Sequence, residues 1–187
     1  MKNIVILTSV FLGGGLFASH LSTSERIKSH KRINWGNNGP VGKISITIDK
    51  SDYELSVYDD KGWYATYPVV FGNNSLGDKK MLGDKNTPEG TFRIANKRVH
   101  EKWCRFLSLD YPTADDIEKF NKRKEKSEIP ANASIGGGIG IHGVWPHEDF
   151  VVDRYKNWTL GCISMKNEDV KEIYSFTNPG TKVTIKK

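Results

Sequence analysis

Apolar and polar residues alternate along most of the chain from residue 43 onward, and this two-residue period predicts β-strands with one buried face. In the first such stretch Ile44, Ile46 and Ile48 alternate with polar residues. A D-D-K-G turn at 59–62 separates two later stretches, as in a meander. The predicted strands cover residues 43–48, 53–57, 63–71, 91–94, 105–111, 135–142 and 182–186.

Two short helices interrupt this pattern. Thr113 with Asp116 three residues later resembles a capping box and predicts a helix over 114–126. Asn167 is predicted to cap a second helix, which ends at the N-P-G sequence of 178–180. Because strands and helices do not alternate regularly, the predicted fold class is mostly β, a β-sandwich or open barrel with a few short helices.

The N-terminus has a different character. After Lys2 the chain runs for 15 residues without a charge, which is short for a membrane span and typical of a signal segment. We predict a signal peptide or N-terminal anchor at 1–18, a polar linker at 19–42 and one folded domain at 43–187. The chain is then exported to the periplasm or cell envelope, and only its N-terminal segment contacts the membrane.

Composition and charge narrow the classes of function. The 187 residues include two cysteines, too few for a disulfide-rich scaffold or a four-thiolate metal site. The formal net charge of +6 favours anionic surroundings without selecting nucleic acid, lipid or cell-wall polymer. The predicted helix within 113–128 is rich in lysine, and it is either a solvated surface helix or a docking face for an anionic substrate.

Three other patterns point to functions that their context excludes. The spacing G-x-G-x-x-G at 138–143 matches a dinucleotide fingerprint, but Pro146 prevents the helix that the fingerprint must open. His142, His147, Glu148 and Cys162 lack the paired spacing of a zinc site. No module that reads nucleic acid is recognisable. We therefore expect no metal, no cofactor and no nucleic-acid partner.

The residues that carry chemistry are a His-Gly pair at 142–143 and the sequence T-L-G-C-I-S-M at 159–165. A thiol needs a base to become the nucleophilic thiolate, and a histidine within hydrogen-bond reach supplies one. Gly161 leaves the flank of Cys162 open for a substrate carbonyl to approach the backbone N–H groups there. The alternatives are a buried structural thiol, a core imidazole, and a Cys104–Cys162 disulfide that would silence the nucleophile.

At these residues the chain resembles the YkuD-type L,D-transpeptidase catalytic domain of bacterial cell-wall enzymes. That family shows His-Gly, a gap of similar length, and then [Ser/Thr]-x-Gly-Cys-[Ile/Val]. The upstream segment 83–92, G-D-K-N-T-P-E-G-T-F, resembles a second family motif, and the resemblance covers about residues 43–186. It implies a β-sandwich-like fold with a groove over the cysteine, and peptidoglycan stem peptides as the substrate.

The resemblance also implies a role for each residue of the two motifs. Cys162 is the expected nucleophile and His142 the expected general base. Gly143 and Gly161 are expected to orient the histidine and to help hold the oxyanion. Thr159 and Ser164, which flank the cysteine, are expected to contact substrate. These six positions form the predicted site.

The sequence departs from the common family pattern at two positions. Many members read Ser-His-Gly-Cys-Ile-Arg, whereas this chain has Leu160 and Ser164 in place of the histidine and the arginine. The pattern is closer to a branch that includes hydrolases, one of which releases a wall-linked lipoprotein. The alternatives to a transpeptidase are therefore a hydrolase of the same fold, a non-catalytic wall-binding module and a metal-dependent peptidase. The segment 101–134 is an expected site of differences in substrate specificity.

Overall fold

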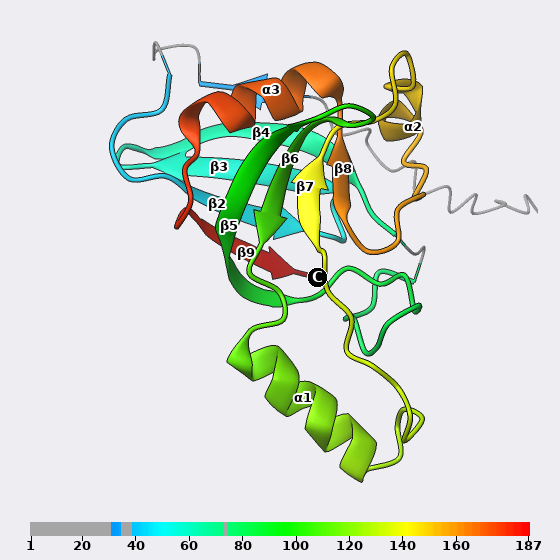
Figure 1. The fold of residues 1–187 in the computed structure, drawn as a ribbon. Coiled ribbons are helices and arrows are strands. Elements are labelled where there is room, and N and C mark those ends of the chain that lie inside the picture. The colour runs from blue at the N-terminus through cyan, green and yellow to red at the C-terminus, as the bar shows by residue number, and fades with distance from the viewer. Residues whose placement is uncertain (1–30, 35–38, 73–74) are drawn as a thin grey trace, which may run out of the picture.

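The computed structural model describes residues 31–34, 39–72 and 75–187, which form a barrel-like sheet and three helices (Figure 1). Most of the predicted signal segment and linker therefore lies outside the described residues. Within the described part of the chain, no helix is long and apolar enough to cross a membrane. The strands are β1 (Arg32–Ile33), β2 (Ser45–Asp49), β3 (Glu54–Asp59), β4 (Gly62–Val70), β5 (Gly90–His100), β6 (Cys104–Leu109), β7 (Gly140–His142), β8 (Ile163–Met165) and β9 (Lys182–Lys186).

Eight of these strands form a closed circuit. The order runs β4-β3-β2-β9-β5-β6-β7-β8, and β8 pairs back with β4. β1 lies outside this circuit and pairs with β4, so part of the expected linker adds a short edge strand to the domain. The predicted fold class, mostly β with a few short helices, is confirmed, and the open barrel of the prediction is closed by β8.

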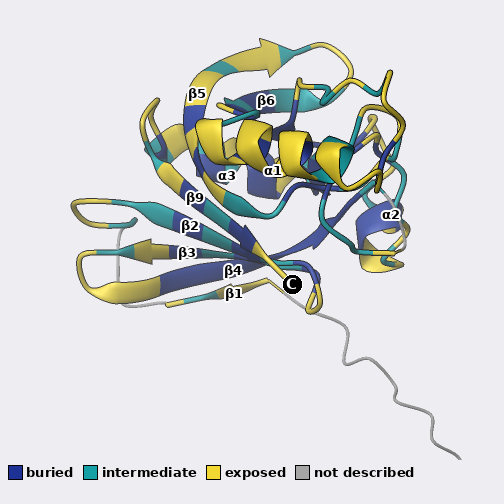
Figure 2. Ribbon diagram, turned by 90° about the horizontal axis from the view of Figure 1, so that it is seen from below, coloured by how far each residue is buried: buried dark blue, intermediate teal, exposed yellow. Residues whose placement is uncertain are grey.

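The predicted alternation explains the core. Ile46, Ile48, Leu55 and Val57 lie at alternate positions of β2 and β3 and are all buried. Completely burying an aliphatic side chain of this size stabilises a fold by roughly 1.5–3 kcal/mol. Figure 2 shows buried residues along both strands, where they alternate with residues of intermediate exposure. β4 is different, because every residue from Tyr64 to its end is buried.

The C-terminal strand β9 lies inside the sheet. It pairs in parallel with β2 and antiparallel with β5. Val183 and Ile185, the two residues that the sequence places on one face, are both buried. The strand therefore joins the N-terminal meander β2-β3-β4 to the β5-β6 hairpin that carries part of the site.

Three elements were not predicted, and one was predicted too long. β1, β8 and α2 (Phe150–Asp153) have two, three and four residues, too few to show a period. The predicted strand at 135–142 forms ladder pairs only at Gly140–His142. Its first residues carry glycines with positive φ at 136 and 138, which a regular strand does not adopt.

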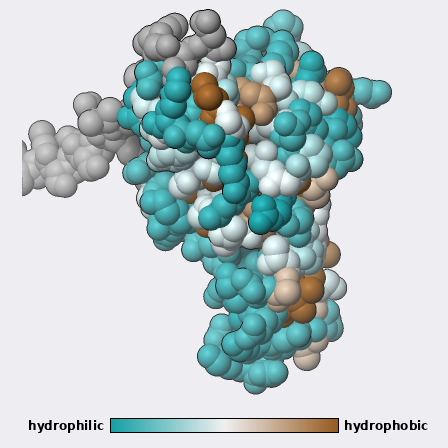
Figure 3. Space-filling view, turned by 90° about the vertical axis from the view of Figure 1, so that its left-hand side faces the viewer, coloured by the Kyte–Doolittle hydropathy of each residue, from teal (hydrophilic) through white to brown (hydrophobic). Residues whose placement is uncertain are grey.

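The helix α1 (Ala114–Glu125) projects from the barrel, and its lobe is mostly hydrophilic in Figure 3. Thr113 and Asp116 form both bonds of the predicted capping box. Segment 113–128 is not a basic face, because it holds as many acidic as basic residues. These are Lys119, Lys122, Arg123, Lys124 and Lys126 against Asp115, Asp116, Glu118, Glu125 and Glu128. This balance argues against a docking face for anions.

The helix α3 (Asn167–Phe176) begins at the predicted residue without the predicted cap. Its N-cap is Lys166, whose side chain makes no capping bond. The Asn167 amide oxygen instead accepts a hydrogen bond from the Val144 N–H at 3.1 Å. Asn167 therefore ties the helix to the chain that follows β7.

A buried lysine fixes the loop at 75–89 to the barrel. Lys50 has 0% exposure, and its Nζ donates to the carbonyls of Gly77 at 3.0 Å and Thr87 at 3.1 Å. The same ammonium pairs with Glu89 at 2.7 Å. Burial lowers the pKa of Lys50, and the bonds to Glu89 oppose that change. Lys50 thus attaches the loop that holds the second family motif to the sheet.

We predict that Lys50→Met destabilises the domain by about 3 kcal/mol, because it leaves Glu89 and two carbonyls without their buried partner. Urea unfolding of the purified domain measures this change. The control is Lys186→Met, which removes an exposed ion pair with Asp49 and is expected to leave the unfolding midpoint unchanged. Equal midpoints for both variants would contradict the role of Lys50.

Candidate active site

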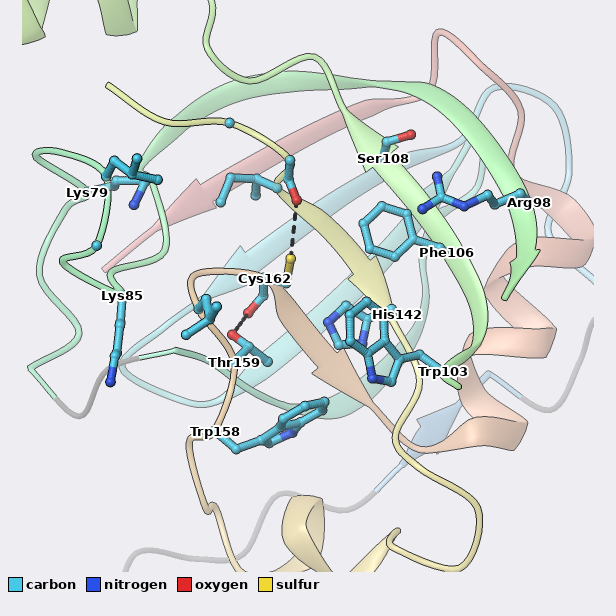
Figure 4. A pocket seen from close by; sticks show the side chains of 16 residues that line it. Lys79, Lys85, Arg98, Trp103, Phe106, Ser108, His142, Trp158, Thr159 and Cys162 are labelled. Atoms are coloured by element: carbon cyan, nitrogen blue, oxygen red, sulfur yellow. Dashed lines mark hydrogen bonds between the residues drawn. The ribbon is translucent and has the colours of Figure 1, made fainter. Parts of the chain in front are cut away.

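Cys162 and His142 line one cavity of about 700 Å3. The cavity is walled by the β5-β6 hairpin, by the loop at 79–85, by the chain leading into β7 and by the loop that precedes β8 (Figure 4). Both cysteines of the chain are free thiols, so the Cys104–Cys162 disulfide is not formed. The structure therefore brings the expected nucleophile and the expected base into the same open site.

Pairing between two short strands causes this meeting. β7 and β8 run parallel, with Ile141 opposite Ile163 and His142 opposite Ser164. Cys162 immediately precedes β8, and His142 ends β7. Strands in a parallel pair lie about 4.8 Å apart, and Cys162 lies two residues before the partner of His142, so the pairing brings both side chains to the wall of the same cavity.

The His142 imidazole is held by one hydrogen bond and three aromatic rings. Its Nδ1 lies 2.7 Å from the Gly143 carbonyl oxygen. Because a carbonyl only accepts, Nδ1 carries the proton and Nε2 is left with a free lone pair. The ring stacks on Trp103 with centroids 4.6 Å apart and on Phe106 at 5.7 Å, and Trp158 meets it edge-on at 5.6 Å.

Burial keeps both reactive groups uncharged. It lowers the pKa of His142 to about 4, although the bond to Gly143 opposes this change. Burial also raises the pKa of the Cys162 thiol, against a smaller opposing effect of the Gly140 backbone. At neutral pH the resting pair is a thiol beside a neutral imidazole with a free Nε2. This imidazole can accept the proton when a substrate is attacked.

The Cys162 thiol does not point at a helix end. It donates to the Gly138 carbonyl at 3.5 Å. The thiol next to the start of α3 belongs to Cys104, whose Sγ lies 3.9 Å from the Asn167 carbonyl oxygen. The start of α3 therefore makes no contact with the Cys162 thiol, and the imidazole is the group available to take the proton.

Gly161 is required by its backbone and by its neighbours. Its φ is +131°, a region that side chains rarely adopt, and a Cβ would lie 2.8 Å from the Asn86 carbonyl oxygen. Asn86 belongs to the second family motif, so the two motifs pack directly against each other at this glycine. Its N–H donates to the Thr159 hydroxyl at 3.2 Å.

Gly143 is required by close packing. A Cβ there would lie 2.2 Å from the Asn167 amide oxygen and 2.9 Å from the Trp103 carbonyl oxygen. Its N–H donates to that Trp103 carbonyl at 3.0 Å, and its own carbonyl receives the His142 bond. With both N–H groups already bonded, Gly143 and Gly161 shape and orient the site, and neither N–H is free to hold an oxyanion.

Thr159 and Ser164 have structural contacts. The Thr159 hydroxyl donates to the Cys162 carbonyl at 2.7 Å and thereby closes the turn that presents the thiol, on the wall of the cavity. Ser164 has 0% exposure, lies outside the cavity and donates to the Gly143 carbonyl at 3.3 Å. The Ser164 hydroxyl, which was expected to contact substrate, thus faces the backbone that orients His142 and not the cavity.

Two features of the cavity were not predicted from the sequence, its aromatic wall and the cations at its rim. Trp103, Phe106 and Trp158 line the cavity and surround the imidazole. Three of the five tryptophans (Trp103, Trp145 and Trp158) lie in one cluster of rings, which only the folded chain brings together. The rim also carries Lys79, Lys85 and Arg98, whose positions no motif indicated.

The metal-ligand set considered from the sequence does not assemble. His147 and Glu148 are exposed and lie outside the cavity that holds His142 and Cys162. Among the described residues, no three His, Cys, Asp or Glu side chains are grouped as metal ligands. The chemistry available at this site is that of a thiol and an imidazole.

The low pKa of His142 predicts a pH-dependent stability. Between about pH 6.5 and 4 the unfolded chain binds a proton that the folded site refuses, so stability falls as the pH falls through this window. The expected loss is about 3 kcal/mol relative to His142→Gln, which has no proton to gain. Denaturant unfolding of both proteins at pH 7, 5.5 and 4 measures the difference, and parallel curves would contradict the burial of a neutral imidazole.

The sequence of this chain matches a family of known proteins. The family model described as the L,D-transpeptidase catalytic domain (YkuD) matches residues 43–185. The Escherichia coli K12 protein named "Probable L,D-transpeptidase YcfS" is 25% identical over 155 residues, which is 75% of this chain and 43% of YcfS. This chain thus spans less than half the length of that relative.

Solved structures share the fold at low sequence identity. The Campylobacter jejuni helical cell shape determining protein Pgp2 (K307A mutant) superposes with a TM-score of 0.55 at 20% identity, over 86% of this chain and 50% of that one. Bdellovibrio bacteriovorus Bd1075 gives a TM-score of 0.52 at 22% identity, over 78% and 48%. Because the family model covers most of the described domain, the chain belongs to the YkuD family of L,D-transpeptidase catalytic domains.

Proposed function

We propose that this chain is a cysteine-dependent L,D-transpeptidase that acts on peptidoglycan stem peptides through a thioester at Cys162. The observation that carries the proposal is the pairing of β7 with β8, which places the Cys162 thiol and the buried His142 imidazole in one cavity. Membership of the family supports the transpeptidase type of reaction. The cell wall is also an anionic polymer, which suits the net charge of +6.

Acylation begins with proton transfer. Nε2 of His142 takes the thiol proton as sulfur attacks the carbonyl carbon at the L-centre of the third stem residue. The tetrahedral intermediate carries an oxyanion, which the backbone N–H of Cys162 stabilises. The amide C–N bond then breaks, and the imidazolium gives its proton to the leaving amine of the C-terminal D-residue. The products are a thioester on Cys162 and a free amine.

The resting site favours this sequence of steps. A neutral thiol and a neutral imidazole need no counter-ion in a cavity walled by Trp103, Phe106 and Trp158. A charged imidazolium forms only as the carbonyl is attacked, and at that moment the negative charge passes from sulfur to the carbonyl oxygen of the substrate. Contact of the imidazole with the Trp103 and Phe106 rings restricts its rotation, so the lone pair on Nε2 keeps its direction.

The second half-reaction decides the product. An amine from a neighbouring stem attacks the thioester and forms a crosslink, whereas water releases a shortened stem. A wall-linked lipoprotein as the leaving group gives the hydrolase of the alternative hypothesis. We propose the amine as acceptor and place the enzyme outside the cytoplasmic membrane, in the periplasm or cell envelope, where both peptides occur.

The nucleophile is tested by replacing each thiol in turn. Cys162→Ala is expected to lose at least about a thousandfold in turnover of tetrapeptide-containing muropeptides. Cys104→Ala, the matched control, is expected to keep wild-type activity, because Cys104 lies outside the cavity. Intact-mass spectrometry after incubation with a carbapenem is expected to show an adduct on the wild type and on Cys104→Ala only. Full activity of Cys162→Ala would overturn the assignment.

The base is tested by pH. Because His142 is an effective base only when neutral, the acylation rate should stay constant from pH 7 to 5 and fall only near pH 4. The rate of carbapenem adduct formation between pH 3.5 and 8 measures this limb. His142→Gln is expected to acylate about 100- to 10,000-fold more slowly while remaining folded. A limb near pH 6.5 would mean that the imidazole is not buried during catalysis.

The acceptor is tested by the products from purified sacculi. Incubation with the enzyme followed by mass spectrometry is expected to yield new crosslinked dimers, in amounts that Cys162→Ala does not produce. Accumulation of shortened or released peptides without dimers would show that water is the acceptor. Binding to sacculi with neither product, and with no carbapenem adduct, would favour the non-catalytic module.

A further inference from the structure

The charges on the cavity wall have one sign. Lys79, Lys85 and Arg98 line the cavity, whereas no aspartate or glutamate does so within the described part of the chain. A cavity lined by one sign of charge concentrates ligands of the opposite sign. The cations differ in what they already contact, and this difference shows which of them is available to a ligand.

Lys79 is used by the protein itself. Its side chain is buried and pairs with Asp84 at 2.7 Å, and its Nζ also donates to the Met81 carbonyl at 3.0 Å. Asp84 accepts three further bonds from backbone N–H groups of this loop, from Lys80, Met81 and Asn86. Lys79 therefore stabilises the loop, and its charge is neutralised.

Arg98 is placed but unpaired. It extends from β5, and its guanidinium carbon lies 4.5 Å from the centre of the Phe106 ring. That ring also stacks on the His142 imidazole, so a single phenyl ring positions both groups. No ion pair joins Arg98 to a carboxylate in the residues that the structure describes. Its planar N–H edge is free to bind a carboxylate with two parallel hydrogen bonds.

The Cys162 motif supplies no such group. The arginine that many family members carry two residues after the cysteine is Ser164 here, and Ser164 is buried against Gly143. Any guanidinium on the cavity wall therefore comes from another element. Among the described residues that line the cavity, Arg98 is the only arginine.

Lys85 stands on the opposite wall. Figure 4 shows Lys85 and Arg98 on opposite sides of Cys162. Lys85 is exposed, and in the described residues its ammonium pairs with no carboxylate. Its backbone is fixed by the loop, because its carbonyl lies against Gly72, where a Cβ would come within 2.0 Å of it. The thiol is thus bracketed by two unpaired cations of different shape.

We propose that Arg98 and Lys85 each bind a carboxylate of the acyl-donor peptide, one on each side of the carbonyl that Cys162 attacks. This inference rests on the proposed function and makes it more specific. The preferred donor carries free carboxylates both before and after the scissile bond. A stem peptide in which either carboxylate is amidated is a poor donor. Arg98 and Lys85 are binding residues, and neither takes part in proton transfer.

The test pairs variants with substrates. The variants are Arg98→Gln, Arg98→Lys and Lys85→Gln, and the control is Arg154→Gln. Arg154 is a matched control because it is exposed and stacked on Phe150 at 5.3 Å, yet it lies outside the cavity. The substrates are a synthetic tetrapeptide donor and derivatives with each carboxylate amidated in turn. Affinity is measured in a Cys162→Ala background and kcat/KM in the active enzyme.

Arg98→Gln is expected to weaken binding and lower kcat/KM by about 10- to 100-fold on the free acid. It should have no further effect on the one derivative whose amide replaces the carboxylate that Arg98 binds. Lys85→Gln should show the same relation, with a smaller loss, for a different carboxylate. Arg98→Lys should recover only part of the loss, because an ammonium lacks the planar fork. Arg154→Gln should match the wild type.

Equal losses on all donors, or no loss on any, would overturn the assignment of Arg98 and Lys85. The carbapenem adduct separates this failure from failure of the proposed function. If the wild type and Arg98→Gln both form the carbapenem adduct but turn over all donors equally well, the two carboxylate sites are wrongly assigned and the assignment of Cys162 as nucleophile is unaffected. If the wild type forms no adduct and turns over no donor, the proposed function fails.

Discussion

The parallel pairing of β7 with β8 is the constraint on which the site depends. The two strands have three residues each, too few to be stable alone, and they persist because β8 also pairs with β4 and β7 with β6. Closure of the barrel is therefore what holds Cys162 beside His142. The glycines at 143 and 161 allow the chain around this pair to approach its neighbours more closely than any Cβ permits.

Burial gives the site its chemical character. An imidazole with 1% exposure, stacked on aromatic rings, resists protonation, and a half-buried thiol resists ionisation. Because the resting thiol is uncharged, it needs a base to become the nucleophilic thiolate, and the neutral imidazole on the same cavity wall is the candidate base. In the proposed reaction the thiol therefore loses its proton only when a substrate carbonyl is present, because the carbonyl oxygen takes up the negative charge of the sulfur.

The sequence predicts the strands, and the cavity position of Cys162 and His142, better than it predicts the surroundings of these two residues. Alternation located seven strands because each has a buried face, whereas β8 is recognisable only through its partners in space. Cys162 and His142 follow from their motifs, since their chemistry requires those residue types. The direction of the Ser164 side chain depends on the β7-β8 register, which the sequence does not show. Trp103 and Arg98 were missed because the hairpin that carries them meets the site only in the folded chain.

The residues that bind a charged group of the substrate can lie on different elements while the thiol and the imidazole keep their positions. The thiol, the imidazole and the two glycines are fixed by close contacts, so few substitutions are tolerated there. A cation that binds a substrate carboxylate needs only a rigid support and an unpaired edge facing the cavity. Phe106 already provides the support, because it walls the imidazole, and a neighbouring position of β5 then places Arg98 over its ring. Phe106, which stacks on the imidazole, therefore also positions the guanidinium that we propose to bind a substrate carboxylate.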